Sequence, residues 1–89
     1  MHYRVFAADI ARTLTACGHT NSQTGPAWRP GHRATQASPT TARVHHDGPD
    51  EAEHLKRYAT VLAADGFTVT AERAAGRRPS LRITKQTKT

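Results

Sequence analysis

Residues 49 to 65 have the pattern of an amphipathic helix with both ends marked, and this pattern limits what the rest of the chain can fold into. Pro49 suits the first helical position, and acidic residues follow it near the positive end of the helix dipole. Gly66 comes directly after the segment and commonly ends helices. One stripe of apolar side chains recurs at helical spacing: Ala52, Leu55, Tyr58, Ala59, Val61 and Leu62. Such a helix needs a second layer to cover its apolar stripe.

The segments on either side of this helix alternate apolar and polar residues, as strands with one buried face do. Residues 41 to 46 precede the helix, and residues 67 to 72 and 81 to 84 follow it. The last two are joined by a turn and predict an antiparallel hairpin. The first two are joined by the helix, so we expect them to run parallel through a right-handed crossover if they share a sheet. The inner face is predicted to carry Val44, Phe67, Val69, Leu81 and Ile83.

The beginning of the chain predicts a second helix, over residues 5 to 17, that completes the core. A short strand over residues 2 to 6 is the alternative. The helix is expected to end before Gly18, a residue type that favours the left-handed conformation of a helix end. Its apolar residues recur at helical spacing: Phe6, Ile10, Leu14 and Cys17.

Residues 18 to 40 are rich in Gly, Pro, Ser and Thr and have almost no apolar periodicity. They predict a long flexible loop, with Trp28 as its only large apolar residue. At the other end of the chain, residues 85 to 89 are polar and basic and predict a frayed tail.

The predicted fold class is α+β, a small two-layer sandwich in one domain over residues 1 to 89. The predicted order is helix, long loop, strand, helix, strand, strand, with a basic hairpin at the C-terminal end. A chain of 89 residues buries only a little over ~60% of the surface that it exposes when unfolded, so its core is thin. A homodimer is one way to add to such a core.

Several classes of protein are excluded or disfavoured by composition. Cys17 is the only cysteine, so no intrachain disulfide forms, which fits a reducing compartment. No apolar run approaches the ~20 residues that a membrane span needs. Asp9 stands where a signal peptide would be apolar. We therefore expect a cytoplasmic protein that is not bound to a membrane.

The charge of the chain indicates an anionic partner. It has 13 Lys and Arg residues against 7 Asp and Glu residues, a formal net charge of +6, and no acid after Glu72. The arginine guanidinium pairs well with phosphate. The predicted function is therefore that of a nucleic-acid-binding accessory or regulatory protein, with double-stranded DNA as the expected ligand and the hairpin as the contact surface. The predicted contact residues are Arg73, Arg77, Arg78, Arg82, Lys85, Arg43, Arg29, Arg33 and Trp28.

Residues 49 to 85, a helix followed by a basic hairpin, are similar to the end of a winged-helix DNA-binding domain. The chain departs from that pattern, because a strand-like segment stands where the preceding helix is needed. The helix also begins with the acids Asp50, Glu51 and Glu53, which would repel phosphates. The contacts are therefore expected on the hairpin, the loop arginines and the open face of the sheet. That face is predicted to carry Arg43, His45, Thr68, Thr70, Arg82 and Thr84.

Two other functions fit the same residues. One is a protein–protein interaction module, such as an inhibitor or a phage- or plasmid-type accessory factor, that binds an acidic partner. The other is a small ribonuclease toxin, in which histidines act as acid and base. No spacing motif supports a particular catalytic set, so we expect a protein that is not an enzyme and needs no cofactor. Cys17 and His19, with other histidines far along the chain, lack the paired spacing of a zinc site, and no metal ligands are assigned.

Overall fold

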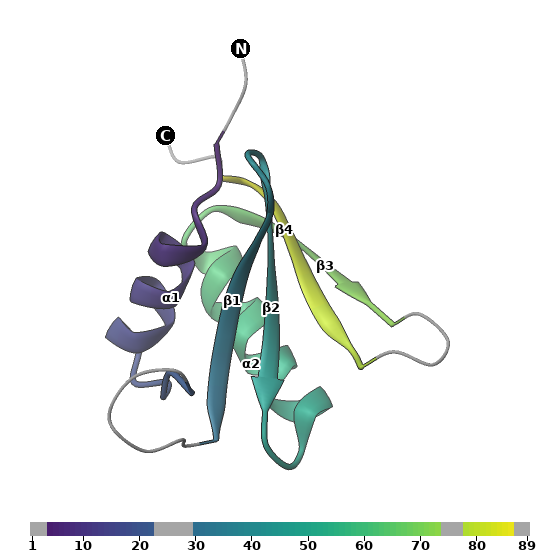
Figure 1. The fold of residues 1–89 in the computed structure, drawn as a ribbon. Coiled ribbons are helices and arrows are strands. Elements are labelled where there is room, and N and C mark those ends of the chain that lie inside the picture. Colours follow the sequence, from purple (N-terminus) through teal and green to yellow (C-terminus); the bar gives the residue numbers. More distant parts are fainter. Residues whose placement is uncertain (1–3, 23–29, 74–77, 87–89) are drawn as a thin grey trace.

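The structure, a computed structural model, describes residues 4–22, 30–73 and 78–86. It is an α+β protein in which the described residues form two helices and a four-stranded antiparallel sheet (Figure 1). Both helices lie on the same side of the sheet. In chain order the elements are α1 (Ala7–Ala16), β1 (Gly31–Ser38), β2 (Thr41–Asp47), α2 (Glu51–Ala64), β3 (Phe67–Glu72) and β4 (Ser80–Gln86).

The strands lie in the order β1, β2, β4, β3 across the sheet, so the last strand of the chain is an inner one. β1 and β2 form an antiparallel hairpin, and β4 is antiparallel to both β2 and β3. β2 and β3 therefore run in the same direction, as the sequence predicted for strands joined by a helix. They do not pair with each other, because β4 lies between them.

The core lies between α2 and the sheet, where the apolar alternation of the strands meets the apolar stripe of the helix. Leu62, Val44 and Ile83 have no exposed surface, and all five predicted inner-face residues are buried or packed against the core. The helix was predicted over 49 to 65 and is observed over Glu51–Ala64. Pro49 precedes it, because Asp50 takes a left-handed conformation (φ 59°) before the first turn.

The first helix was predicted at nearly the right place, but its ends pack differently. Ile10 and Leu14 are fully buried. Phe6 is 51% exposed, because its extended backbone (φ −103°, ψ 126°) places it before the helix rather than on its apolar stripe. Val5 takes its place in the core, and Cys17 at the other end is exposed.

The predicted long loop was wrong for residues 31 to 38, which form β1. The sequence pattern does not indicate this strand, because its inner positions are a histidine, an alanine and a glutamine instead of large apolar residues. Other parts of the chain hold it in place: β2 pairs along its length, and Asn21 forms a bridge with His32. Residues 23 to 29, which include Trp28 and Arg29, lie outside the described residues.

The C-terminal end also differs from prediction. Lys85 and Gln86 belong to β4, where they pair with Thr68 and Phe67, so the predicted frayed tail is wrong for these two residues. The tip of the predicted basic hairpin, residues 74 to 77, lies outside the described residues. No helix in the described part of the chain is long and apolar enough to cross a membrane.

Candidate nucleic-acid interface

Four arginines gather on the face of the sheet that the helices leave open. Arg43 on β2 lies directly opposite Arg82 on β4. Arg33 on β1 lies opposite His45 on β2. Arg78, two residues before β4, lines the same shallow hollow as Arg33, Arg43 and His45. We call Arg33, Arg43, Arg78 and Arg82 the arginine face. The structure thus brings together residues that are up to 49 positions apart in the sequence.

Asp47, at the end of β2, holds one side of the arginine face. Its carboxylate accepts hydrogen bonds from the Ser22 hydroxyl at 2.7 Å and from Arg33 Nε at 3.0 Å, and Arg78 lies 3.3 Å away. Burial alone would raise the pKa of Asp47, but the hydrogen bonds from Ser22 and Arg33 outweigh burial and hold that pKa below its usual value. Asp47 is therefore a fixed anion that positions two of the four arginines.

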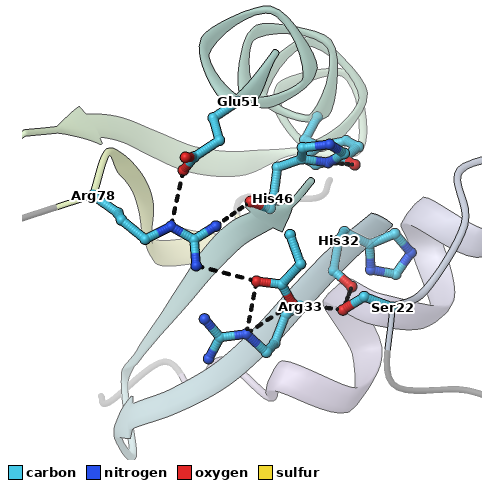
Figure 2. Close-up of polar contacts among 8 residues, drawn as sticks. Ser22, His32, Arg33, His46, Glu51 and Arg78 are labelled. Atoms are coloured by element: carbon cyan, nitrogen blue, oxygen red, sulfur yellow. Dashed lines mark hydrogen bonds and ion pairs between the residues drawn. The ribbon is translucent and has the colours of Figure 1, made fainter. Parts of the chain in front are cut away.

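Arg78 ties β4 to the junction between β2 and α2. Figure 2 shows its guanidinium between Glu51 and the backbone of His46. Arg78 Nε donates to Glu51 at 3.0 Å, and the terminal nitrogens donate to Asp47 and to the His46 carbonyl oxygen. Arg78 was predicted as a phosphate contact. The structure places it in a network of three protein acceptors, where it joins segments about 30 residues apart.

Glu72, at the end of β3, holds the other side of the arginine face. Its carboxylate lies 2.8 Å from Arg43 and 3.8 Å from Arg82, so it forms a hydrogen bond with the first and only an ion pair with the second. The two arginine side chains remain 42% and 48% exposed. Because a guanidinium carries five N–H donors, both can bind a phosphate while Glu72 keeps them in position.

The two layers of the molecule differ in charge. The helix layer carries Glu51 and four other described acids, on the helices and their caps: Asp9, Asp50, Glu53 and Asp65. The helices themselves carry three cations, Arg12, Lys56 and Arg57. The four arginines of the open face are contacted by three acids, Asp47, Glu72 and, from α2, Glu51. A polyanion is therefore attracted to the sheet side and repelled from the ends of α2.

His45 lies within the arginine face. Burial lowers its pKa, and the positive charges of Arg33, Arg78 and Arg43 lower it further against the opposing effect of Asp47. It is therefore neutral near pH 7. Its Nδ1 atom is buried without a hydrogen-bond partner among the described residues.

The opposite face of the same strands carries a histidine–tyrosine cluster that the sequence did not predict. It consists of four histidines around one buried tyrosine: His19, His32, His46, His54 and Tyr58. His46 Nδ1 and the Tyr58 hydroxyl share a hydrogen bond of 2.7 Å, and the His46 and His54 rings stack with centroids 4.0 Å apart. The His19 and His32 rings meet the Tyr58 ring edge-on at 5.0 and 5.8 Å.

Burial shifts the pKa values of three histidines and the tyrosine of this cluster. It is the largest cause of the lowered pKa values of His19, His32 and His46, and it raises the pKa of Tyr58 to about 12. The stacked rings of His46 and His54 are almost parallel (9°), so their nitrogens cannot point at one ion. In the described part of the chain, no group of three metal-ligating side chains is arranged to hold a metal. The cluster packs around Tyr58, against the apolar core.

Of the remaining predicted contact residues, the structure describes the side chain of Arg73 alone, and it does not join the arginine face. Arg73 follows β3 and lines a groove on the helix side. Lys85 lies in β4 at the far end from Arg78. Arg29, Trp28 and Arg77 lie outside the described residues.

The chemistry of the arginine face is that of anion binding: fixed guanidinium groups and a neutral histidine on an accessible, aromatic-poor surface. Strand alternation was the signal that identified Arg43 and Arg82 on this face. No sequence signal identified the carboxylates that hold the arginines. Comparisons with protein-family models, with curated proteins and with solved structures each gave no match to this chain.

Proposed function

We propose that the protein binds nucleic acid through the arginine face, with double-stranded DNA as its ligand. The observation that carries the proposal is the placement of Arg33, Arg43 and Arg82 on three adjacent strands of one open face. Strands are about 4.8 Å apart and Arg33 lies two residues along β1 from the position opposite Arg43, so these arginines span about 12 Å, which is close to the width of the major groove of DNA. Glu51 of α2 binds Arg78, and the other described acids of the helix layer lie on the helices and their caps, so the approach of a polyanion is favoured from the sheet side.

The contact surface in this proposal is the sheet, with the hairpin in a supporting role. Arg78 is already bound by Asp47, Glu51 and the His46 carbonyl, so a phosphate would compete with three acceptors there. Arg43 and Arg82 have one shared acceptor, Glu72, and are about half exposed. These two arginines are therefore the expected phosphate contacts.

A duplex is the favoured ligand because the described part of the open face has no Phe, Tyr or Trp. Proteins that bind single strands stack bases on aromatic side chains. The open face instead has arginines and threonines, such as the row Thr35, Arg43, Arg82 and Thr70 across the four strands. Such side chains reach phosphates and base edges of an intact duplex.

The proposed role is binding without catalysis, as an accessory or regulatory protein. Hydrolysis of a phosphodiester by histidines needs an acid and a base within reach of the same bond. His45 is the one described histidine on the open face, and the histidines of the cluster pack around Tyr58 on the opposite face.

The test is fluorescence anisotropy with a labelled random duplex at low and moderate salt. The variant Arg43→Ala/Arg82→Ala removes the two expected contacts, and Arg12→Ala/Arg57→Ala removes the same charge from the helices, where both side chains are well exposed. We expect the first variant to bind roughly tenfold more weakly and to lower the salt slope by about two contacts. The second variant is expected to lose about threefold or less.

Equal losses in both variants would contradict the arginine face and assign the affinity to net charge. No binding of the unaltered protein at low salt would reject the proposed function. The acidic protein partner would then be the function to test. A stronger affinity for single strands than for the duplex would reject the choice of ligand.

A further inference from the structure

The two outer strands of the sheet differ in what lies along their edges. On β1, the His32 N–H donates to the Thr20 carbonyl at 2.8 Å, and the Ser22 N–H donates to the His32 carbonyl at 3.0 Å. Gly31 allows this close approach, because a Cβ there would lie 2.1 Å from the Thr20 oxygen. Farther along, the Gln36 side chain donates to the Val5 carbonyl. The edge of β1 is thus covered by preceding segments of the chain.

β3, at the opposite end of the sheet, has no such cover among the described residues. It pairs with β4 on one side, and no backbone hydrogen bond joins its other side to another described segment. The strand Phe67–Glu72 contains no proline, lysine or glycine. The irregularity in its pairing falls on β4, where Thr84 is the extra residue, so β3 itself is regular. A regular strand with an unpaired edge is a template for another strand.

An apolar groove lies beside the end of this strand, on the helix side of the sheet. Ala52, Leu55 and Ala59 of α2 form one wall, and Ala71 of β3 and Leu81 of β4 form the other. Unpaired backbone groups and accessible apolar surface therefore occur at the same edge. Each favours contact with a further chain, the first by hydrogen bonds and the second by burial.

We propose that two copies of the chain pair through β3, antiparallel to each other, to form one continuous sheet. A second copy fits this edge because two identical strands can pair antiparallel about a two-fold axis. Each copy then donates and accepts the same set of backbone hydrogen bonds. The same axis brings the groove of each copy against the α2 helix of the other. Each groove is then covered by helix surface, and each β3 edge is paired.

The charges at the two ends of β3 favour this pairing. Arg73 follows β3 and is exposed at the rim of the groove. The other end of β3 adjoins the C-terminal end of α2, which has Asp65 as its cap and no basic residue in its last turn. That end of a helix is negative. Antiparallel pairing places Arg73 of one copy near this negative end in the other, twice in the dimer.

The pairing also fixes where the two arginine faces lie. The two-fold axis of an antiparallel strand pair is perpendicular to the sheet, so all four helices fall on one side and both arginine faces on the other. The dimer would therefore present a doubled, two-fold symmetric arginine face, which suits a DNA site with inverted half-sites. This last consequence rests on the proposed function, whereas the pairing itself does not.

The test is sedimentation equilibrium of the protein alone over a range of concentrations. Ala71→Lys places a charge in the groove at an exposed position of β3, and Ala37→Lys makes the same change at an exposed position of β1. We expect a dimer for the unaltered protein and for Ala37→Lys, and at least a tenfold higher dissociation constant for Ala71→Lys. Circular dichroism establishes that each variant is folded.

A cross-linking experiment gives a positive signal that does not depend on destabilising the dimer. Thr70 near the middle of β3 lies close to its own copy in the dimer, and Thr35 lies in the same cross-strand row on β1. In a Cys17→Ser background, Thr70→Cys is expected to give a covalent dimer with a short bismaleimide, and Thr35→Cys is expected to remain monomeric.

A protein that is monomeric at every concentration would overturn the proposal. So would a dimer that Ala37→Lys dissociates and Ala71→Lys leaves intact, or a dimer that cross-links through Thr35→Cys. These samples contain no DNA, so a failure of the proposed dimer can be told apart from a failure of the proposed DNA binding.

Discussion

The two faces of the sheet carry titratable side chains from neighbouring positions in the sequence, with opposite results. His32 and Arg33 are adjacent on β1, and His45 and His46 are adjacent on β2. His32 and His46 point inward, where burial lowers their pKa values. Arg33 points outward, where it keeps its charge and pairs with Asp47. Alternation decides the side, and residue type decides the charge, since burial also lowers the pKa of His45 on the open face.

The inner face of the sheet depends on packing, and the open face depends on charge. The histidine–tyrosine cluster contributes rings that fit together, with His46 stacked on His54 and bonded to Tyr58. The arginine face contributes groups that carboxylates hold apart at the surface. Substitutions on the two faces should therefore differ in what they disturb: stability on the inner face and ligand binding on the open face.

The largest expected effect is on the inner face of β4. Ile83 has no exposed surface, so Ile83→Ala leaves a cavity in the core and should lower the free energy of unfolding by about 2–5 kcal/mol. Urea denaturation measures the change. A loss below about 1 kcal/mol would mean that the inner face does not depend on packing as described.

A smaller effect is expected at Asp47, which joins Ser22, β1 and Arg78. Asp47→Ala removes the acceptor for Ser22, Arg33 and Arg78 and should cost about 1–3 kcal/mol. Asp9→Ala is the control, since Asp9 forms an exposed ion pair with Arg12 and its loss should cost less than about 0.5 kcal/mol. Equal costs for the two variants in urea denaturation would show that the Asp47 network does not stabilise the fold.

Lowering the pH is expected to reduce the stability of the fold gradually. The folded pKa values of His19, His32, His45 and His46 lie below the ordinary value of 6.5, so the unfolded chain takes up protons first as pH falls. Their contribution to stability is complete above about pH 6.5 and declines below it. Urea midpoints at pH 7.5 and pH 5.5 should show the decline. This range lies above the titration of Asp47, so a midpoint that does not change would contradict the buried, neutral state of the histidines.

The smallest effect on stability is expected on the open face of β4. Arg82→Ala replaces the neighbour of Ile83 in the sequence, removes a half-exposed side chain and an ion pair of 3.8 Å, and should change the free energy of unfolding by less than about 0.5 kcal/mol. The same variant should weaken binding to duplex DNA measurably in the anisotropy assay. If Arg82→Ala lowers the stability but leaves the affinity for DNA unchanged, the assignment of ligand binding to the open face is wrong.

The elements that could be predicted are those in which local pattern and tertiary packing agree. The stripe of α2 and the alternation of β3 are visible in the sequence because large apolar residues occupy the inner positions, and Phe67–Glu72 was found with its observed bounds. β1 was missed because tertiary contacts support it: His32 packs against Tyr58, and Gln36 binds the segment before α1.

The candidate site could likewise be predicted only where local pattern was enough. Alternation was enough to place Arg43 and Arg82 on the open face. It could not show that Arg78 is bound by Asp47 and Glu51, since those contacts join residues about 30 positions apart. The six histidines were noted as a composition feature. That four of them surround Tyr58 depends on how α1, β1, β2 and α2 pack, which no local pattern contains.

The place of β4 in the sheet affects how the chain folds as it is synthesised. β4 is made after the other elements, yet it fills the gap between β2 and β3. Until Ser80–Gln86 has left the ribosome, β2 has one unpaired edge, β3 has two, and α2 has no complete sheet to cover. The sheet can therefore be completed only after Ser80–Gln86 is available to insert between β2 and β3, and a chain that lacks β4 should not reach the native structure.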